Sequence, residues 1–171
     1  WSAHGPHITR WAVGYTVPCE LIVATICTES GGNPLSVRQE SGYKTDQETP
    51  NRVSVGLMQT LISTAREVTR FHFIDREWLL KPENAIQAGT AMIAHQFPET
   101  RFDPPKVACA YKAGGVYYQN GPQNRWKMRQ FPIGTGEHCD RFVKWFNECF
   151  VMFKEDHNTP EMSFTRVLNE V

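Results

Sequence analysis

The sequence lacks an excess of charge of either sign. Its 171 residues include 18 Lys plus Arg and 18 Asp plus Glu. Nucleic-acid-binding proteins usually carry a basic excess, so this balance gives no support to a nucleic-acid partner. No stretch approaches the roughly 18 consecutive apolar residues that a membrane-spanning helix needs, so we expect no transmembrane segment. No secretion signal is visible, and because the sequence starts at Trp1 rather than Met, we expect a processed form or a fragment of a longer protein.

Patterns of metal ligands are also missing. The cysteines form no Cys-x-x-Cys pair, and no further ligand accompanies His4 and His7, so we expect neither a metal site nor an organic cofactor. Four of the five cysteines lie in apolar helical patterns, where a buried thiol is the ordinary outcome. We therefore expect free thiols, as in proteins made in a reducing compartment. The five residues are Cys19, Cys27, Cys109, Cys139 and Cys149.

What the sequence does contain is helical periodicity. Apolar residues recur at helical spacing most clearly between about residues 136 and 154. The apolar stripe of that segment consists of Phe142, Phe146, Cys149, Phe150 and Phe153. Similar patterns predict helices at 18–29, 60–71, 82–96 and 104–113, and a helical turn at 75–80. Pro or Gly marks an end of the helices at 18–29, 82–96 and 104–113. The length suits a single domain, so we predict one mainly α domain over residues 1–171, with the helix at 136–154 packed on its core.

The segment around residues 31–55 breaks the helical pattern. It is polar, contains Gly, Pro, Asp and Asn, and has no clear period. We interpret it as a small irregular or β segment, with one short strand at 52–55. Loops of this length inside a compact domain tend to be functional or disordered.

Glu29 stands where an apolar helical stretch ends. Residues 26–34 read ICTESGGNP, so the carboxylate comes just before two glycines and a proline. A Glu at a helix end is most often only a solvated terminus. A partly buried carboxylate facing a cleft, however, has a raised pKa and can hold a proton near neutral pH. The choice between these interpretations depends on the segments that follow.

Three later segments accompany Glu29. They are GLMQ at 56–59, which we expect to open a helix, PENAIQAG at 82–89 and ACAYKAG at 108–114. Their order and spacing resemble the soluble lytic transglycosylase domain, a relative of goose-type lysozyme. In that family a Glu-Ser pair, a Gly-Leu-Met-Gln segment, an Asn-Ile-x-x-Gly helix and an Ala-Tyr-Asn-x-Gly segment line one sugar-binding cleft. The resemblance covers residues 17–115 and implies a lysozyme-like helical domain with a substrate cleft.

The sequence departs from the family pattern at several positions. Lys112 replaces the usual Asn, and Ala85 stands where the Asn of Asn-Ile-x-x-Gly is expected, with Asn84 one position early. Arg38 lies nine residues after Glu29, where a Ser that contacts substrate is common.

Extra residues before the GLMQ segment indicate an enlarged loop on one wall of the cleft. Within this loop, Ser41 or Ser54 can supply the missing hydroxyl.

The resemblance assigns the catalytic role to Glu29. It implies substrate contacts for Ser30, Ser54, Met58, Gln59, Asn84 and Tyr111. The amide of Gln59 can both donate and accept hydrogen bonds to a sugar. Ser30 is expected to cap the helix rather than to react, because no His-Asp pair is placed to activate it. The aromatic residues Tyr117, Tyr118 and Trp126 either form sugar-stacking subsites or pack within the loop.

The reaction implied by the resemblance uses one carboxylate. Glu29 protonates the oxygen between N-acetylmuramic acid and N-acetylglucosamine, and the acetamido group of the substrate assists at the anomeric carbon. Glu29 then accepts a proton from the C6 hydroxyl as a 1,6-anhydro ring closes, without consuming water. A residue that acts as acid and then as base needs a pKa near the working pH.

Two other functions remain open from the sequence. A muramidase of the goose-lysozyme type would hydrolyse the same bond with Glu29 and a second carboxylate. Glu40, Asp46 and Glu48 in the enlarged loop are candidates for that carboxylate. The other alternative is a non-catalytic glycan-binding or phage-tail structural module.

The expected partners are peptidoglycan glycan strands, together with an inhibitor or immunity protein that blocks the cleft. We expect action on the cell wall, in the periplasm or outside the cell. Delivery as a phage component or by a secretion apparatus suits a sequence without a visible signal, as does a periplasmic enzyme whose leader is missing.

Overall fold

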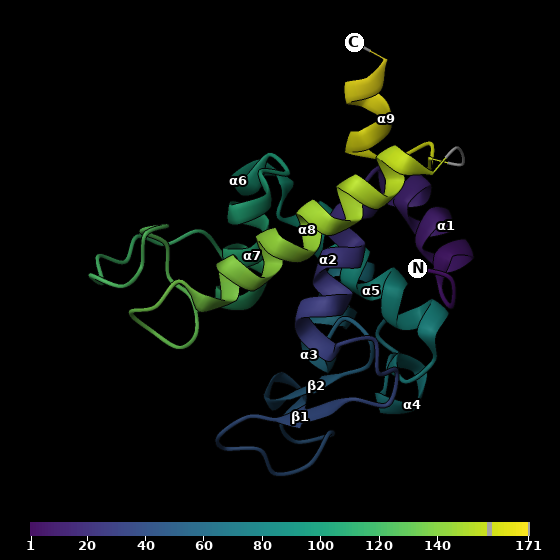
Figure 1. Ribbon diagram of the computed structural model, residues 1–171. Coiled ribbons are helices and arrows are strands. Elements are labelled where there is room, and N and C mark those ends of the chain that lie inside the picture. The colour runs from purple at the N-terminus through teal and green to yellow at the C-terminus, as the bar shows by residue number, and fades with distance from the viewer. Residues whose placement is uncertain (157–158, 171) are drawn as a thin grey trace.

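The computed structural model describes residues 1–156 and 159–170, and Figure 1 shows their arrangement. Helix accounts for 54% of the chain, so the predicted mainly α fold is confirmed. The helices are α1 (Gly5–Tyr15), α2 (Cys19–Ser30), α3 (Ile62–Thr69), α4 (Arg76–Leu79), α5 (Pro82–His95), α6 (Phe97–Thr100), α7 (Pro104–Ala113), α8 (Glu137–Glu155) and α9 (Phe164–Asn169). The strands are β1 (Val37–Gln39), β2 (Val53–Val55) and β3 (Thr60–Leu61), and a 3₁₀ turn, η1 (Pro50–Arg52), precedes β2.

Helix α2 forms the centre of the larger core, and α8 lies across it (Figure 1). Most of α2 is buried, from Cys19 to Ile26, because its apolar residues surround the helix rather than forming one stripe. Helix α8 is amphipathic and buries Phe142, Cys149 and Phe153 against this core, as its periodicity predicts. Helix α2 therefore begins inside the core, and its last turn lies at a surface pocket.

A smaller apolar cluster lies at the other end of the molecule. It joins β2 to helices α3 and α4 through Val53, Val55, Ile62 and Leu79. The three strands form an antiparallel sheet in the order β1-β2-β3, with Val37 opposite Val55 and Ser54 opposite Leu61. Only β2 was predicted. The other two strands have three residues or two, too few for an alternating pattern to be visible in the sequence.

The GLMQ segment forms a turn between β2 and β3, not the start of a helix. Gly56 and Gln59 have φ values of 84° and 48°, which a right-handed helix does not allow. Helix α3 begins only at Ile62. This prediction was wrong because the backbone conformation at Gly56 is set by its close approach to the carbonyl of Leu79, a contact between distant parts of the chain.

The enlarged loop between β1 and β2 is fixed to α4 by a polar network. Arg76 donates hydrogen bonds to both carboxylate oxygens of Asp46, each at 2.8 Å, and the Tyr43 hydroxyl donates to the same carboxylate at 2.6 Å. The hydrogen bonds from Arg76 lower the pKa of Asp46, and the one from Tyr43 adds to this effect. Paired two-pronged contacts of this kind fix geometry as well as adding energy. The loop is therefore held in one position beside the sheet.

The C-terminal segment is tied to the first turn of α2. The buried carboxylate of Glu20 accepts hydrogen bonds from the backbone N–H groups of Phe164 and Thr165, at 2.9 and 2.8 Å. Helices α1, α6 and α9 were not predicted. The five cysteines are free thiols, four of them buried. Within residues 1–156 and 159–170, no helix is long and apolar enough to cross a membrane.

The GLMQ turn packs directly on α5 because residue 89 is a glycine. A Cβ placed there would lie 2.6 Å from the Cβ of Met58, so we expect Gly89→Ala to destabilise the protein by about 1–3 kcal/mol through overpacking. Gly14→Ala is the matched control in α1, where the nearest atom to the new Cβ is 3.5 Å away. That change should instead gain up to about 1 kcal/mol from helix propensity. Urea denaturation of the two variants tests the contrast, and a Gly89→Ala protein as stable as wild type would contradict it.

Candidate active site

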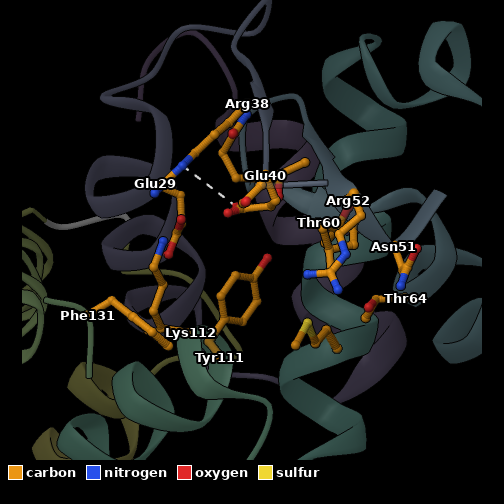
Figure 2. A pocket seen from close by; sticks show the side chains of 15 residues that line it. Glu29, Arg38, Glu40, Asn51, Arg52, Thr60, Thr64, Tyr111, Lys112 and Phe131 are labelled. Carbon is orange, nitrogen blue, oxygen red and sulfur yellow. Dashed lines mark ion pairs between the residues drawn. The ribbon is translucent and has the colours of Figure 1, made fainter. Parts of the chain in front are cut away.

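A pocket of about 380 Å³ opens where the end of α2, the sheet and α7 meet. Figure 2 shows the side chains that line it. Helix α2 contributes Glu29, the strands and their loop contribute Ser54 and Gln59, and α7 contributes Tyr111 and Lys112. The two apolar clusters thus supply one wall each, and the site lies between them.

Glu29 lies in the last turn of α2 and is partly buried. Burial raises the pKa of its carboxyl group, while the nearby charges of Lys112, Arg38 and Arg141 oppose that rise. A carboxylate at the C-terminal end of a helix also meets the negative end of the helix dipole, which disfavours ionisation. In Figure 2 the Glu29 carboxyl group and the Lys112 side chain point toward one another. The site therefore opposes ionisation by burial and supports it by nearby cations.

Tyr111 is buried at the base of the pocket, with its ring extending into it (Figure 2). Its hydroxyl donates a hydrogen bond to the carbonyl of Met58 at 2.6 Å. Burial and the nearby charge of Glu29 raise the pKa of Tyr111 well above its usual range, so the phenol stays neutral. Because its proton is already engaged, Tyr111 contributes a ring face and connects α7 to the GLMQ turn.

Gln59 and Ser54 also line the pocket, as the sequence predicts. The amide nitrogen of Gln59 donates to the carbonyls of Ser36 and Gly56, at 2.9 Å each. Both amide hydrogens are therefore used to hold the backbone, and the amide oxygen is left to accept from a ligand. Ser54 is buried in the central strand, at the position opposite Arg38 and Leu61.

Three residues predicted to contact substrate do not line the pocket. Ser30 donates to the carbonyl of Ile26 at 3.2 Å and accepts from the N–H of Gly32, so it ends the helix. Met58 is fully buried against α5. Asn84 donates to the carbonyl of Trp78 at 3.1 Å, in the first turn of α5. These side chains stabilise neighbouring segments and do not form part of the pocket surface.

Of the three candidates for a second carboxylate, the pocket brings only Glu40 near Glu29. Glu40 lines the pocket and pairs with Arg38 at 3.7 Å. Asp46 is engaged by Arg76 in the loop network, and Glu48 is exposed; neither lines the pocket.

Several lining residues were not predicted as site residues. Arg52 and Asn51 come from η1 in the enlarged loop, Thr64 from α3, and Phe131 from the segment that follows α7. Lys112 was noted only as a departure from the family pattern. The only sequence signal for Arg52 and Asn51 was their place in the loop predicted to form a cleft wall.

The aromatic residues considered for sugar stacking lie elsewhere. Tyr117 and Tyr118 are exposed, and Trp126 donates to Asp140 at 2.9 Å; none of the three lines the pocket. Phe131, in contrast, lines the pocket. Within the part of the chain that the structure describes, no group of three His, Cys, Asp or Glu residues is arranged to hold a metal ion.

Comparison with protein families finds one informative match. The family model described as Transglycosylase SLT domain matches residues 6–130, which include every pocket residue discussed above except Phe131. No curated protein matches the chain. The family resemblance drawn from the four sequence segments is therefore confirmed, over most of the chain.

The raised pKa of Glu29 predicts a pH-dependent cost in stability. At pH values between the ordinary Glu pKa of about 4.3 and the higher folded-state pKa, the folded state binds more protons than the unfolded chain. Stability therefore falls as pH rises through that window. Glu29→Gln removes this cost, so we expect a higher Tm than wild type at pH 7, by roughly 2–4 °C for each kcal/mol gained.

Thermal unfolding of both proteins between pH 4 and 8 measures this difference, which should shrink toward pH 4. The exposed Glu48, outside the pocket, provides the control, and Glu48→Gln should change the Tm little at any pH. A Glu29→Gln protein less stable than wild type at pH 7 would show that the surroundings favour the carboxylate.

Proposed function

The chain belongs to the transglycosylase SLT domain family, and on this premise we propose that it cleaves peptidoglycan without water, with Glu29 as acid and then base. The bond cut is the β-1,4 linkage between N-acetylmuramic acid and N-acetylglucosamine. The muramoyl product carries a 1,6-anhydro ring. Action on peptidoglycan follows from the family, and the residue roles and the product are our proposal.

The observation that supports the proposal most is the environment of Glu29. Burial favours the protonated acid, whereas Lys112, Arg38 and Arg141 favour the carboxylate. A group that must give a proton and then take one back needs both forms within reach at the working pH. A single partly buried carboxylate between an apolar core and several cations meets that requirement.

In the first step, the Glu29 carboxyl group donates its proton to the glycosidic oxygen. The bond from the anomeric carbon to that oxygen breaks, and N-acetylglucosamine leaves with a free 4-hydroxyl group. The carbonyl oxygen of the muramoyl acetamido group forms a bond to the anomeric carbon and holds the positive charge as an oxazolinium ion. No second carboxylate is needed, because the substrate supplies its own nucleophile.

In the second step, the C6 hydroxyl of the same sugar attacks the anomeric carbon. The bond from the acetamido oxygen breaks, and the Glu29 carboxylate accepts the hydroxyl proton. The ring closes and Glu29 returns to its protonated form, so atoms and charge balance without water. An apolar surround that limits solvent access favours this intramolecular attack over hydrolysis.

Other lining residues hold the sugar. The amide oxygen of Gln59 accepts a hydrogen bond from the substrate, and Ser54 supplies the hydroxyl that the family pattern places nine residues after Glu29. The ring of Tyr111 gives an apolar surface beside the acid, and Phe131 gives a second one at the rim of the pocket. Delivery to the wall and an inhibitor protein stay predictions of the sequence.

Replacing the acid tests the proposal directly. Glu29→Gln keeps the shape but cannot transfer a proton, so we expect at least about a 10²-fold loss of wall-lytic activity. The variant should remain folded, as far-UV circular dichroism and its Tm will show. Undiminished lysis by a folded Glu29→Gln protein would remove Glu29 from the mechanism, and lysis by neither protein would favour a glycan-binding module.

Glu40 gives a specific reason to test the muramidase alternative, because it lines the same pocket as Glu29. Mass spectra of digested peptidoglycan separate the two reactions, since a reducing end is heavier than an anhydro end by one water. We expect anhydro ends, and we expect Glu40→Gln to retain activity within about tenfold of wild type, whereas loss of a catalytic base costs about 10²–10⁴-fold.

Glu48→Gln is the matched control, because it makes the same change in the same loop outside the pocket. Reducing ends together with a Glu40→Gln loss as large as that of Glu29→Gln would establish the hydrolase instead.

A further inference from the structure

Two buried thiols that the proposed reaction does not use lie between α7 and α8. Cys109 belongs to α7 and Cys139 to the first turn of α8, and neither side chain is exposed. The Sγ atom of Cys139 lies 3.9 Å from the carbonyl oxygen of Pro105, which is one helical turn before Cys109. The ring of His138 contacts the carbonyl oxygen of Ala108 at 3.1 Å. The sequence neighbours of the two cysteines are therefore in contact, and the two thiols face the same space.

The two thiols also interact directly. They share a hydrogen bond, which lowers the pKa of Cys109 against the opposing effect of burial. The same contact raises the pKa of Cys139, and burial adds to that rise. Thiolates, not thiols, are the nucleophiles in disulfide exchange. Cys109 is therefore the thiol of the pair that reacts first, with Cys139 placed to follow it.

The pair stands at the base of the loop that joins α7 to α8. This loop, residues 114–136, projects from the neighbouring ends of the two helices (Figure 1). The N–H group of Cys139 donates a hydrogen bond to Oε1 of the buried Gln130 at 2.8 Å. The next residue, Phe131, lines the pocket. A covalent bond at Cys139 therefore acts on the backbone that positions Phe131.

The place where the protein acts favours oxidation of this pair. Action on the cell wall follows from the family. Peptidoglycan lies outside the cytoplasm, and disulfides form and persist there rather than inside. The free thiols of the structure thus correspond to the reduced chain. Two adjacent thiols in the same protein meet different conditions at the wall.

We propose that Cys109 and Cys139 form a disulfide in oxidising surroundings, and that this bond fixes the loop 114–136 so that Phe131 keeps its place at the pocket. The device is redox-sensitive, because the loop is held at its base by a covalent bond in one state and by packing and hydrogen bonds in the other. It does not depend on the role of Glu29.

The bond forms by exchange with a small disulfide, such as oxidised glutathione. The Cys109 thiolate attacks one sulfur of the reagent, the S–S bond of the reagent breaks, and one glutathione leaves as a thiolate. The Cys139 thiolate then attacks the sulfur of Cys109 and displaces the second glutathione. Two electrons and two protons pass from the protein to the reagent. Because both thiols are buried, the exchange takes place as the chain folds or when the base of the loop opens.

Peptide mapping of the wild-type chain tests the bond. The protein is unfolded, refolded in a glutathione redox buffer, alkylated in denaturant to label free thiols, and digested without reduction. We expect Cys109 linked to Cys139 as the main disulfide, and Cys149 alkylated. Refolding in a reducing agent should leave all five thiols alkylated. Free Cys109 and Cys139 in the oxidised sample, or a main disulfide between other cysteines, would overturn the proposal.

Thermal unfolding measures what the bond does to stability. It closes a loop of roughly thirty residues in the unfolded chain, so oxidised wild type should have a Tm about 5–10 °C above reduced wild type. Cys109→Ala should abolish this difference. Cys149→Ala is the matched control, because it removes another buried thiol from the same core and should keep the difference. Each variant is compared with itself in two redox states, so any loss of packing cancels. Equal Tm values for the two states of wild type would contradict the proposal.

Trypsin cleavage tests the effect on the loop itself. Lys127 is exposed within the loop 114–136, and Lys44 is exposed in the separate loop between β1 and β2. Oxidation should slow cleavage after Lys127 by about threefold or more, because the loop opens less often, and should leave cleavage after Lys44 unchanged. No slowing at Lys127, or equal slowing at both sites, would overturn the assignment of the bond to this loop.

Discussion

The hydrogen bond from the Tyr111 hydroxyl to the Met58 carbonyl, at 2.6 Å, connects the parts on which the site depends. It joins α7 to the GLMQ turn, and Met58 of that turn packs against Gly89 of α5. Gln59, at the end of the same turn, then holds the start of β1 through its amide. Three segments far apart in the sequence thereby take fixed positions around the pocket. A buried phenol left without this acceptor would cost about 1–3 kcal/mol, so the arrangement is stabilised as a unit.

The proposed acid, Glu29, depends on the same core that stabilises the fold. Helix α2 is buried over most of its length, and this burial extends to its last turn, where it raises the pKa of Glu29. A carboxylate on the surface would not carry this cost in folding stability, but its lower pKa would make it a poorer proton donor at neutral pH. The cations on β1, α7 and α8 reduce the free-energy cost of ionising Glu29, because they stabilise its carboxylate form. In the proposed reaction, stability and proton transfer therefore place opposite demands on Glu29, as is common at active sites.

The sequence predicts the long helices well and places Glu29 at the end of one of them, because periodicity and end signals are local. Three of the four motif segments contribute residues to one pocket, but the sequence does not say which side chain of each segment faces that pocket. Met58 shows the difference, because its neighbour Gln59 lines the pocket while its own side chain packs against Gly89. Asn84 lies in a segment that contributes no lining residue, and its side chain donates to the carbonyl of Trp78. Arg52 and Phe131 were missed for the opposite reason, since no family segment contains them. The position of the Arg52 loop depends on a pair of residues thirty positions apart, which no local pattern reveals.

The proposed acid and the enlarged loop belong to different parts of this fold. The acid and Tyr111 stand on α2 and α7, whose positions are fixed by apolar packing. Arg52 and Asn51 stand on a loop whose middle is held to α4 by a charged network, the Asp46–Arg76 pair with Tyr43. A substitution in that loop is expected to leave the position of Glu29 unchanged, because the two depend on different interactions. Loops on a rigid scaffold are where specificity generally varies. In the proposed function, substitutions in the enlarged loop therefore alter the lining of the pocket while Glu29 keeps its place.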